Sequence, residues 1–171
     1  MKKSLFFYLF AVLCTMSLFT SCSDDDDTPA VSIADTVAGD YDGTLDVLLV
    51  VGGVSGGTNE PVSQTQVVSV DKAGDSTVDL RITGFKFEEY NIGNIELEGC
   101  QLVEAGNGEY KFTAVSEKDL GVLSATINAD GTFSDGKLNL SLDIEDILLA
   151  GGIPVPFTVD VKYEGTKVAG N

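Results

Sequence analysis

Apolar and polar residues alternate along most of the chain after Gly39. The alternation has a period of two over residues 41–49 and recurs over 78–83, 138–144 and 155–163. A period of two places one face of a β-strand in a core and the other face in water. Since no window shows an apolar stripe at helical spacing, the pattern predicts an all-β protein.

Turn signals rich in glycine, aspartate and asparagine divide this part of the chain into eight segments, and short links favour antiparallel neighbours. The predicted strands span residues 39–51, 61–72, 76–86, 92–99, 108–116, 120–129, 132–144 and 153–164. Eight strands in simple succession predict an up-and-down barrel, which closes and leaves no free edge. A sandwich of two sheets is the alternative.

The links of such a barrel alternate between its two ends. Three links are short and polar, as solvated hairpins should be: Asp71–Asp75, Glu104–Gly108 and Asn128–Gly131. Both termini of the barrel fall at this polar end. The opposite end receives links that are apolar and rich in glycine.

Segments 48–54 and 147–153 should meet at the apolar end, because the first and last strands of a closed barrel are neighbours. The predicted ligand or partner rim consists of Leu48, Leu49, Val50, Val51, Val54, Phe85, Phe87, Tyr90, Ile147, Leu148, Leu149 and Ile153. It could be the mouth of a cavity for a small apolar or amphipathic ligand. Alternatively its side chains fold inward and fill the barrel, or they dock another protein of the envelope.

The N-terminus has the order of a bacterial lipoprotein signal. Basic Lys2 and Lys3 precede an apolar stretch, Leu5–Phe19, which small polar residues separate from Cys22. The stretch is shorter than the about 20 apolar residues of a bilayer span. We expect cleavage before Cys22 and acylation of its sulfur, which anchors the chain to a membrane. An ordinary cleaved signal peptide is the alternative.

Four adjacent aspartates, Asp24–Asp27, follow Cys22 and Ser23. Their mutual repulsion favours a solvated tether. The segment also resembles the sorting signal of surface-exposed lipoproteins of anaerobic Gram-negative bacteria, which implies an outer-membrane lipoprotein on the cell surface. The alternative is a spacer that leaves the protein facing the periplasm. The predicted organisation is a signal peptide at 1–21, the lipidated cysteine and flexible tether at 22–38, and a barrel domain at 39–167.

The chain is strongly acidic. It has 171 residues with a formal net charge of −17, and removal of the signal leaves 27 acidic and 8 basic residues, a net charge of −19. Such a surface repels phosphate backbones, which excludes nucleic acid as a partner. About 150 residues remain, enough for one domain with a sizeable core.

Little in the sequence points to catalysis. With no histidine in the chain, neither a Ser-His-Asp triad nor an imidazole metal site can form. Asn128–Gly131 fails as a calcium loop, because Thr126 and Lys137 stand where acids are required. After loss of Cys14 and acylation of Cys22, Cys100 is alone and is expected to pack as a small buried residue. We therefore predict no enzyme, no cofactor and no metal site.

Two short motifs resemble a known family. Gly39-Asp40-Tyr41-Asp42-Gly43-Thr44-Leu45 and Tyr163-Glu164-Gly165-Thr166-Lys167 are similar to the ends of the calycin-like, lipocalin-like domain of bacterial surface lipoproteins. The resemblance spans residues 39–167. It implies an eight-stranded antiparallel barrel and no established activity. Tyr41 stands where true lipocalins have a tryptophan, so the resemblance implies the fold rather than an inherited ligand.

Overall fold

The computed structural model describes residues 31–51, 60–87, 90–119 and 123–169, which all belong to one compact unit, Val31–Asn171. The side chains of residues 87 and 90–92 are outside this description. The elements are α2 (Ile33–Val37), β1 (Gly39–Val51), β2 (Val62–Lys72), β3 (Thr77–Phe87), β4 (Tyr90–Gln101), β5 (Val103–Gly106), β6 (Glu109–Asp119), β7 (Leu123–Ser134), β8 (Lys137–Leu149), β9 (Ile153–Pro154) and β10 (Phe157–Lys167).

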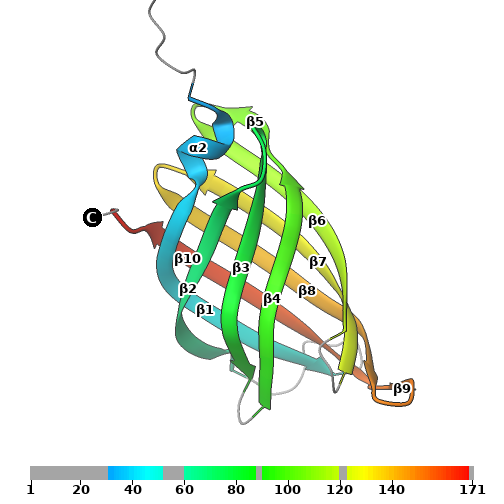
Figure 1. Ribbon diagram of the computed structural model, residues 1–171. Coiled ribbons are helices and arrows are strands. Elements are labelled where there is room, and N and C mark those ends of the chain that lie inside the picture. The colour runs from blue at the N-terminus through cyan, green and yellow to red at the C-terminus, as the bar shows by residue number, and fades with distance from the viewer. Residues whose placement is uncertain (1–30, 52–59, 88–89, 120–122, 170–171) are drawn as a thin grey trace, which may run out of the picture. The chain divides into compact units, whose positions relative to one another are not determined.

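The strands form one antiparallel sheet that curls into a nearly closed barrel (Figure 1). Along the sheet the order is β4-β3-β2-β1-β10-β8-β7-β6-β5, and β9 pairs with β8. The pairing of β1 with β10 joins the two ends of the domain, from Tyr41 opposite Lys167 to Val51 opposite Phe157. This single rolled sheet confirms the predicted barrel over the sandwich. In the described residues ten strands replace the predicted eight, because β5 and the two-residue β9 are separate elements.

One predicted turn is wrong. The sequence Ala129-Asp130-Gly131 lies in the middle of β7, and the chain turns instead at Asp135 and Gly136. Both turn residues have positive φ, 50° and 71°, as a two-residue hairpin requires. Gly131 serves packing, since a Cβ at this position would collide with the ring of Phe112.

The barrel has an open seam between β4 and β6, contrary to the predicted full closure. β5 pairs with β6 only from Val103 to Gly106, and no ladder joins β4 to β6 in the described part of the chain. The chain bends between β4 and β5 at Leu102, whose N–H donates to Ser76 O (2.8 Å) instead of to a neighbouring strand. Above the bend the wall is closed by β5, and below it the two strands diverge (Figure 1).

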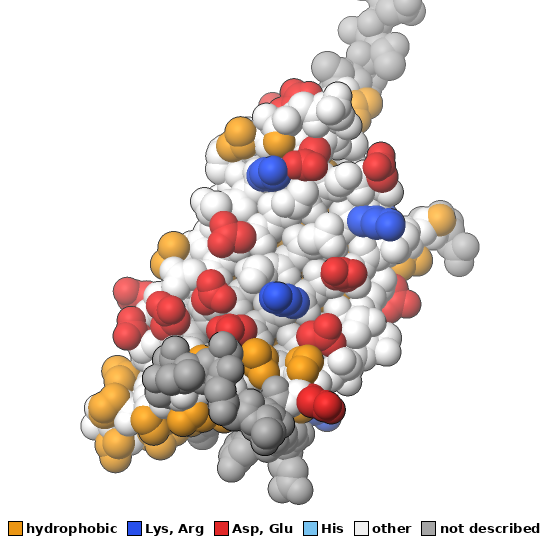
Figure 2. Space-filling model, turned by 180° about the vertical axis from the view of Figure 1, so that it is seen from behind, with side chains coloured by type: hydrophobic (Ala, Val, Ile, Leu, Met, Phe, Trp, Pro, Cys, Tyr) orange, Lys and Arg blue, Asp and Glu red, His pale blue; other side chains and the backbone are white. Residues whose placement is uncertain are grey.

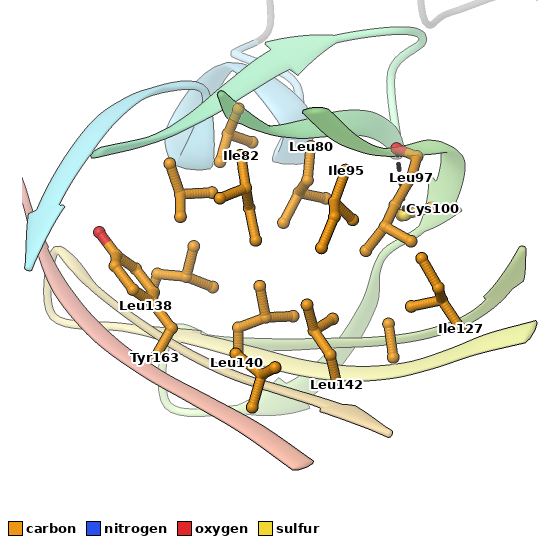
Figure 3. Close-up of a cluster of buried hydrophobic side chains, with 14 of the residues drawn as sticks. Leu80, Ile82, Ile95, Leu97, Cys100, Ile127, Leu138, Leu140, Leu142 and Tyr163 are labelled. Carbon is orange, nitrogen blue, oxygen red and sulfur yellow. Dashed lines mark hydrogen bonds between the residues drawn. The ribbon is translucent and has the colours of Figure 1, made fainter. Parts of the chain in front are cut away.

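Hydrocarbon side chains from opposite walls meet inside the barrel. Figure 3 shows Leu80 and Ile95 pointing toward Leu140 and Leu142 on the facing wall. Among the described residues, no buried side chain is charged or polar apart from the two phenols treated next. An interior of this composition packs as a core.

Two buried tyrosines link the first and last strands to the helix. Tyr163 Oη donates to Tyr41 O (2.7 Å), and Tyr41 Oη donates to Val37 O (2.7 Å). Burial raises the pKa of each phenol to about 12, so both remain donors at neutral pH. Buried phenols need such partners, and these bonds tie α2 to the barrel wall.

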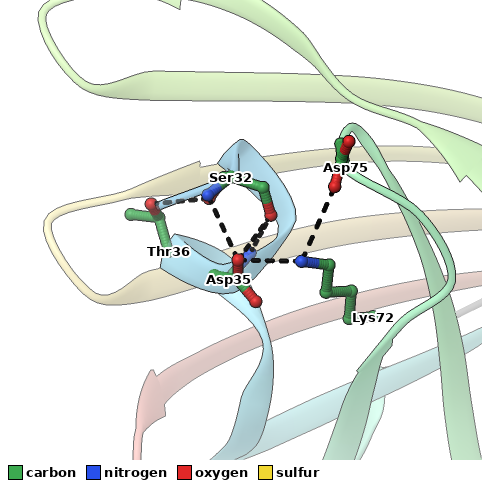
Figure 4. A network of polar contacts seen from close by, with 5 residues as sticks. All are labelled: Ser32, Asp35, Thr36, Lys72 and Asp75. Atoms are coloured by element: carbon green, nitrogen blue, oxygen red, sulfur yellow. Dashed lines mark hydrogen bonds and ion pairs between the residues drawn. The ribbon is translucent and has the colours of Figure 1, made fainter. Parts of the chain in front are cut away.

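The short helix α2 covers the polar end of the barrel and lies within the segment 22–38 that the sequence suggested as a tether. Ser32 caps it: its Oγ accepts from Asp35 N, while its N–H donates to Asp35 Oδ2. Ala34 and Val37 are buried against the core. Lys72 Nζ contacts Asp35 Oδ2 at 2.8 Å and Asp75 at 3.7 Å, which joins the helix to the β2–β3 turn (Figure 4).

We expect the docking of α2 to weaken in acid. Hydrogen bonds from Lys72 and Ser32 lower the pKa of Asp35 to about 2 from an ordinary value of 3.8. Because the folded pKa is the lower one, this stabilisation is complete above about pH 4 and is lost as the pH falls toward 2. NMR titration of the Asp35 carboxyl should give a midpoint near pH 2. A midpoint near 4 would mean that the contacts with Lys72 and Ser32 do not form.

Candidate functional site

The two ends of the barrel differ in composition. The end with α2 carries the turns 73–76, 107–108 and 135–136, all short and polar. The opposite end carries the tip of β1, the β8–β9 hairpin and the start of β10. Figure 2 shows hydrophobic side chains gathered at this end. We define the apolar rim as eight residues of this end whose side chains are exposed or half-buried: Val50, Val51, Leu148, Leu149, Ile153, Pro154, Pro156 and Phe157.

A β-bulge at the end of β8 builds the rim. The register between β7 and β8 shifts between Ser124 and Thr126, opposite Asp146, which has a φ of 48°. A bulge redirects the side chains that follow it. Ile147 therefore turns into the core, where it is 6% exposed, and Leu148 reaches the surface, where it is 37% exposed.

The β8–β9 hairpin projects from the end of the barrel (Figure 1). Gly151 and Gly152 turn the chain with φ values of 92° and 77°, and Gly152 N donates to Leu149 O at 2.9 Å. A positive φ of this kind favours glycine. Leu149 and Ile153, which pair across the hairpin, are 45% and 60% exposed. The hairpin thus presents two large aliphatic side chains to solvent.

A hollow lies on each side of this hairpin. One, of about 310 Å³, is formed with β1 and β10 and is lined by Val50, Asp146, Ile147, Leu148, Pro154, Val155, Pro156, Phe157 and Thr158. The other, of about 190 Å³, lies toward β6 and β7 and includes Asp119, Leu123 and Leu148. Leu148 lines both hollows. The larger one combines residues of the 48–54 and 147–153 segments, which were predicted to meet at the apolar end.

The predicted rim residues separate into three groups. The first group lies at the apolar end with exposed or half-buried side chains and consists of Leu48, Leu49, Val50, Val51, Leu148, Leu149 and Ile153. The second group, Ile147 and Phe85, is buried in the core. Phe85 turns inward because register shifts flank it in β3, where Gly84 has a φ of 66° and donates its N–H to the side chain of Asn94. Cys22, Val54 and the side chains of Phe87 and Tyr90 lie outside the described residues.

Carboxylates of β8 and β10 lie on the barrel wall beside the apolar rim. We call Asp143, Glu145, Asp146 and Asp160 the acidic collar. Asp143 and Asp160 lie directly opposite each other on β8 and β10, and Asp146 lines the larger hollow. Figure 2 shows acidic side chains on the wall next to the hydrophobic end. The sequence pattern alone does not predict this arrangement, although the outward positions of residues 143, 145 and 160 follow from the alternation once the register is known.

A hollow of about 390 Å³ lies elsewhere, on the outer wall formed by β6, β7, β8 and β10. Its outward-facing side chains are polar, such as Thr113 and Asn139, or of mixed charge, such as Lys111 beside Glu109 (2.8 Å). Its opposite charges and polar groups are those of an ordinary solvated sheet face. The part of the chain that the structure describes also contains no cluster of three or more potential metal ligands.

Cys100 is buried, as the sequence predicted. Burial raises the pKa of its thiol to about 11, with a smaller contribution from Asp79. A thiol with so high a pKa reacts slowly because the thiolate is scarce. We expect less than about a tenth of Cys100 to react with a disulfide reagent at pH 8 in the time that labels it fully in 6 M guanidinium. Equal labelling rates in both conditions would contradict the buried position.

Comparison with known proteins places the barrel among related folds. Residues 37–166 match the family model described as a calycin-like beta-barrel domain. The crystal structure of a "putative outer membrane protein" from Bacteroides fragilis is similar, with a TM-score of 0.62 and 18% sequence identity. The match covers 80% of this chain but 53% of that one, so this chain spans about half the length of the Bacteroides protein. No curated protein matches the chain. Within the described residues, no helix has the length and hydropathy of a membrane span.

Proposed function

Because the chain belongs to the calycin-like beta-barrel domain family, we propose that it is a lipid-anchored protein of the bacterial envelope whose apolar rim binds an apolar or amphipathic ligand. The observation that carries the proposal is the hollow of about 310 Å³ beside the exposed β8–β9 hairpin. Ligand sites are concave and mostly apolar, and their volumes start near about 300 Å³. The rim hollow has these properties, with Asp146 and Thr158 as polar groups at its edge.

The composition of the interior favours the rim over the inside of the barrel. A ligand site needs a few polar groups that fix the orientation of the ligand. Inside the described barrel such groups would be the phenols of Tyr41 and Tyr163, and both already donate to backbone carbonyls. The remaining interior side chains are packed hydrocarbon.

Binding of the uncharged dye Nile red to the full chain tests the apolar rim that borders this hollow. Replacing Ile153 by serine should weaken dye binding about threefold or more, because it removes apolar surface from the rim. Val103→Ser is the matched control, since Val103 is 61% exposed on β5 and Ile153 is 60% exposed. Equal dye binding by the two variants would refute the rim as the site.

The anchor is proposed from the N-terminal signal, and the outer-membrane location also draws support from the name of the Bacteroides relative. Cys22→Ala should move the protein from the membrane fraction to the soluble fraction of cells. Cys100→Ala is the control and should leave the distribution unchanged. Surface exposure predicts that protease added to intact cells degrades the protein. A protein that stays in the membrane fraction after the change at Cys22 would refute the lipid anchor.

A second function is supported by the filled interior. In this second function the barrel has a packed core and no internal ligand, and the exposed hairpin docks another protein of the envelope. Exposed apolar patches mark such contact sites. Crosslinking in cells from a cysteine introduced at Val51, which is 53% exposed, separates the two functions. A discrete protein adduct supports docking, and its absence together with dye binding supports a small ligand.

A further inference from the structure

The apolar rim and the acidic collar together define the chemistry of a partner. We infer that the rim receives an amphipathic polypeptide segment whose apolar face packs on the β8–β9 hairpin and whose flanks carry several lysines or arginines. This inference rests on the proposed function and names the class of occupant.

The exposed apolar surface extends beyond the larger hollow to the tip of the β8–β9 hairpin. The hairpin separates hollows of about 310 and 190 Å³, and Leu148 lines both of them. Leu149 and Ile153 lie exposed at the tip between the two. An occupant that covers this surface must contact both sides of the hairpin. The apolar face of an amphipathic segment, with anchors at successive turns or alternate residues, has this extent.

The collar supplies the charge preference. Asp143 and Asp160 face each other directly across β8 and β10, an arrangement of like charges that destabilises a sheet. The ion pairs of the described residues are made by Lys72, Arg81 and Lys111, which do not contact these two carboxylates. A cationic partner would relieve this repulsion.

The collar is also spread out. Neighbouring strands lie about 4.8 Å apart, and residues two apart on one strand are separated by about 6.8 Å. Asp143, Glu145 and Asp160 therefore present carboxylates along two directions of the wall. A small amphiphile with one cationic group can neutralise one of them, whereas a segment with several basic residues can contact several. Charge complementarity of this kind also increases the rate of association.

The same charges disfavour other occupants. A second copy of this chain would bring two acidic collars together, and each mature chain carries a net charge of −19 from 27 acidic and 8 basic residues. An anionic lipid surface would be repelled in the same way. A cationic amphipathic polypeptide would make favourable apolar contacts with the rim and favourable charge contacts with the collar.

Two dye-labelled peptides test the inference on the full chain by fluorescence anisotropy. The first has about 18 residues and consists of leucine and lysine in an amphipathic helical pattern. The second has every lysine replaced by glutamate. The lysine peptide should bind at least about tenfold more tightly, and 0.5 M NaCl should reduce the difference. Equal affinities for the two peptides would overturn the inference.

Matched charge variants separate a local effect from the net charge. Asp143→Asn with Asp160→Asn should weaken binding of the lysine peptide about threefold to tenfold. Asp71→Asn with Glu98→Gln removes two exposed carboxylates on β2 and β4 and should change it little. Equal losses in both double variants would overturn the inference, since attraction would then depend on net charge alone. If Ile153→Ser weakens Nile red binding but peptide charge has no effect, only the inference fails and the proposed ligand site stands.

Discussion

Replacing Phe85 by alanine should lower the free energy of unfolding by about 3–5 kcal/mol. Phe85 is 1% exposed and is one of the largest fully buried side chains of the described residues. Its removal would leave a cavity in a packed core, and the surrounding structure relaxes only in part around such a cavity. Urea unfolding followed by far-UV circular dichroism gives the measurement.

The control for this prediction is Ile153→Ala. The sequence pattern predicted both residues as part of the same rim, but Ile153 is 60% exposed. Its truncation should therefore lower the free energy of unfolding by less than about 1 kcal/mol. Similar small losses for both variants would show that Phe85 points out of the barrel rather than into it.

Replacing Gly43 by alanine should lower the free energy of unfolding by about 3 kcal/mol or more, because the added Cβ would collide with backbone atoms rather than with a flexible side chain. Gly43 lies opposite Gly165 in the pairing of β1 with β10. A Cβ at Gly43 would collide with the carbonyl oxygen of Glu164 and lie 2.5 Å from the Cα of Gly165. Only separation of the two strands would relieve the collision, and that separation would disturb the bond from Tyr163 Oη to Tyr41 O.

Asp42→Ala is the matched control, because Asp42 precedes Gly43 on the same strand and its side chain is exposed. We expect this substitution to change the free energy of unfolding by no more than about 0.5 kcal/mol. Thermal unfolding at pH 7 should place the Gly43 variant well below both the wild type and the control. Coincident transitions for the two variants would contradict the close approach of β1 and β10.

The alternation along the chain was sufficient to predict the strands and their order, because each strand has one face in the core. It could not locate the bulges. Gly84 and Asp146 each disturb the period by one residue and so reverse which side chains face inward. Phe85 and Ile147, both predicted at the rim, are buried in the core for this reason.

Turn chemistry explains the misplaced hairpin. Asp130-Gly131 and Asp135-Gly136 are the same dipeptide, and both carry the signal of a two-residue turn. Tertiary contacts decide between them. Phe112 from the neighbouring strand covers Gly131, while Gly136 meets open space and has the positive φ of a turn.

The candidate site was predictable in part. The apolar segments at both ends of the domain were evident because β1 and β10 had to be neighbours. The collar was not evident, since Asp143 and Asp160 are 17 positions apart and only the register of β8 with β10 places them together. The two hollows beside the hairpin likewise depend on Asp146 and on the Gly151-Gly152 turn.

The open seam means that the circumference of this barrel is not fixed by hydrogen bonding. In a closed barrel the number of strands and their stagger set the radius, whereas here β4 and β6 can separate or approach without breaking a ladder. Within β6, successive amides point alternately toward β7 and toward the seam. From Thr113 to Glu117, every second amide should exchange its hydrogen with solvent quickly, and the amides between them should exchange slowly. Such an alternation would show that β6 makes no interstrand hydrogen bonds toward β4 along this part of the wall.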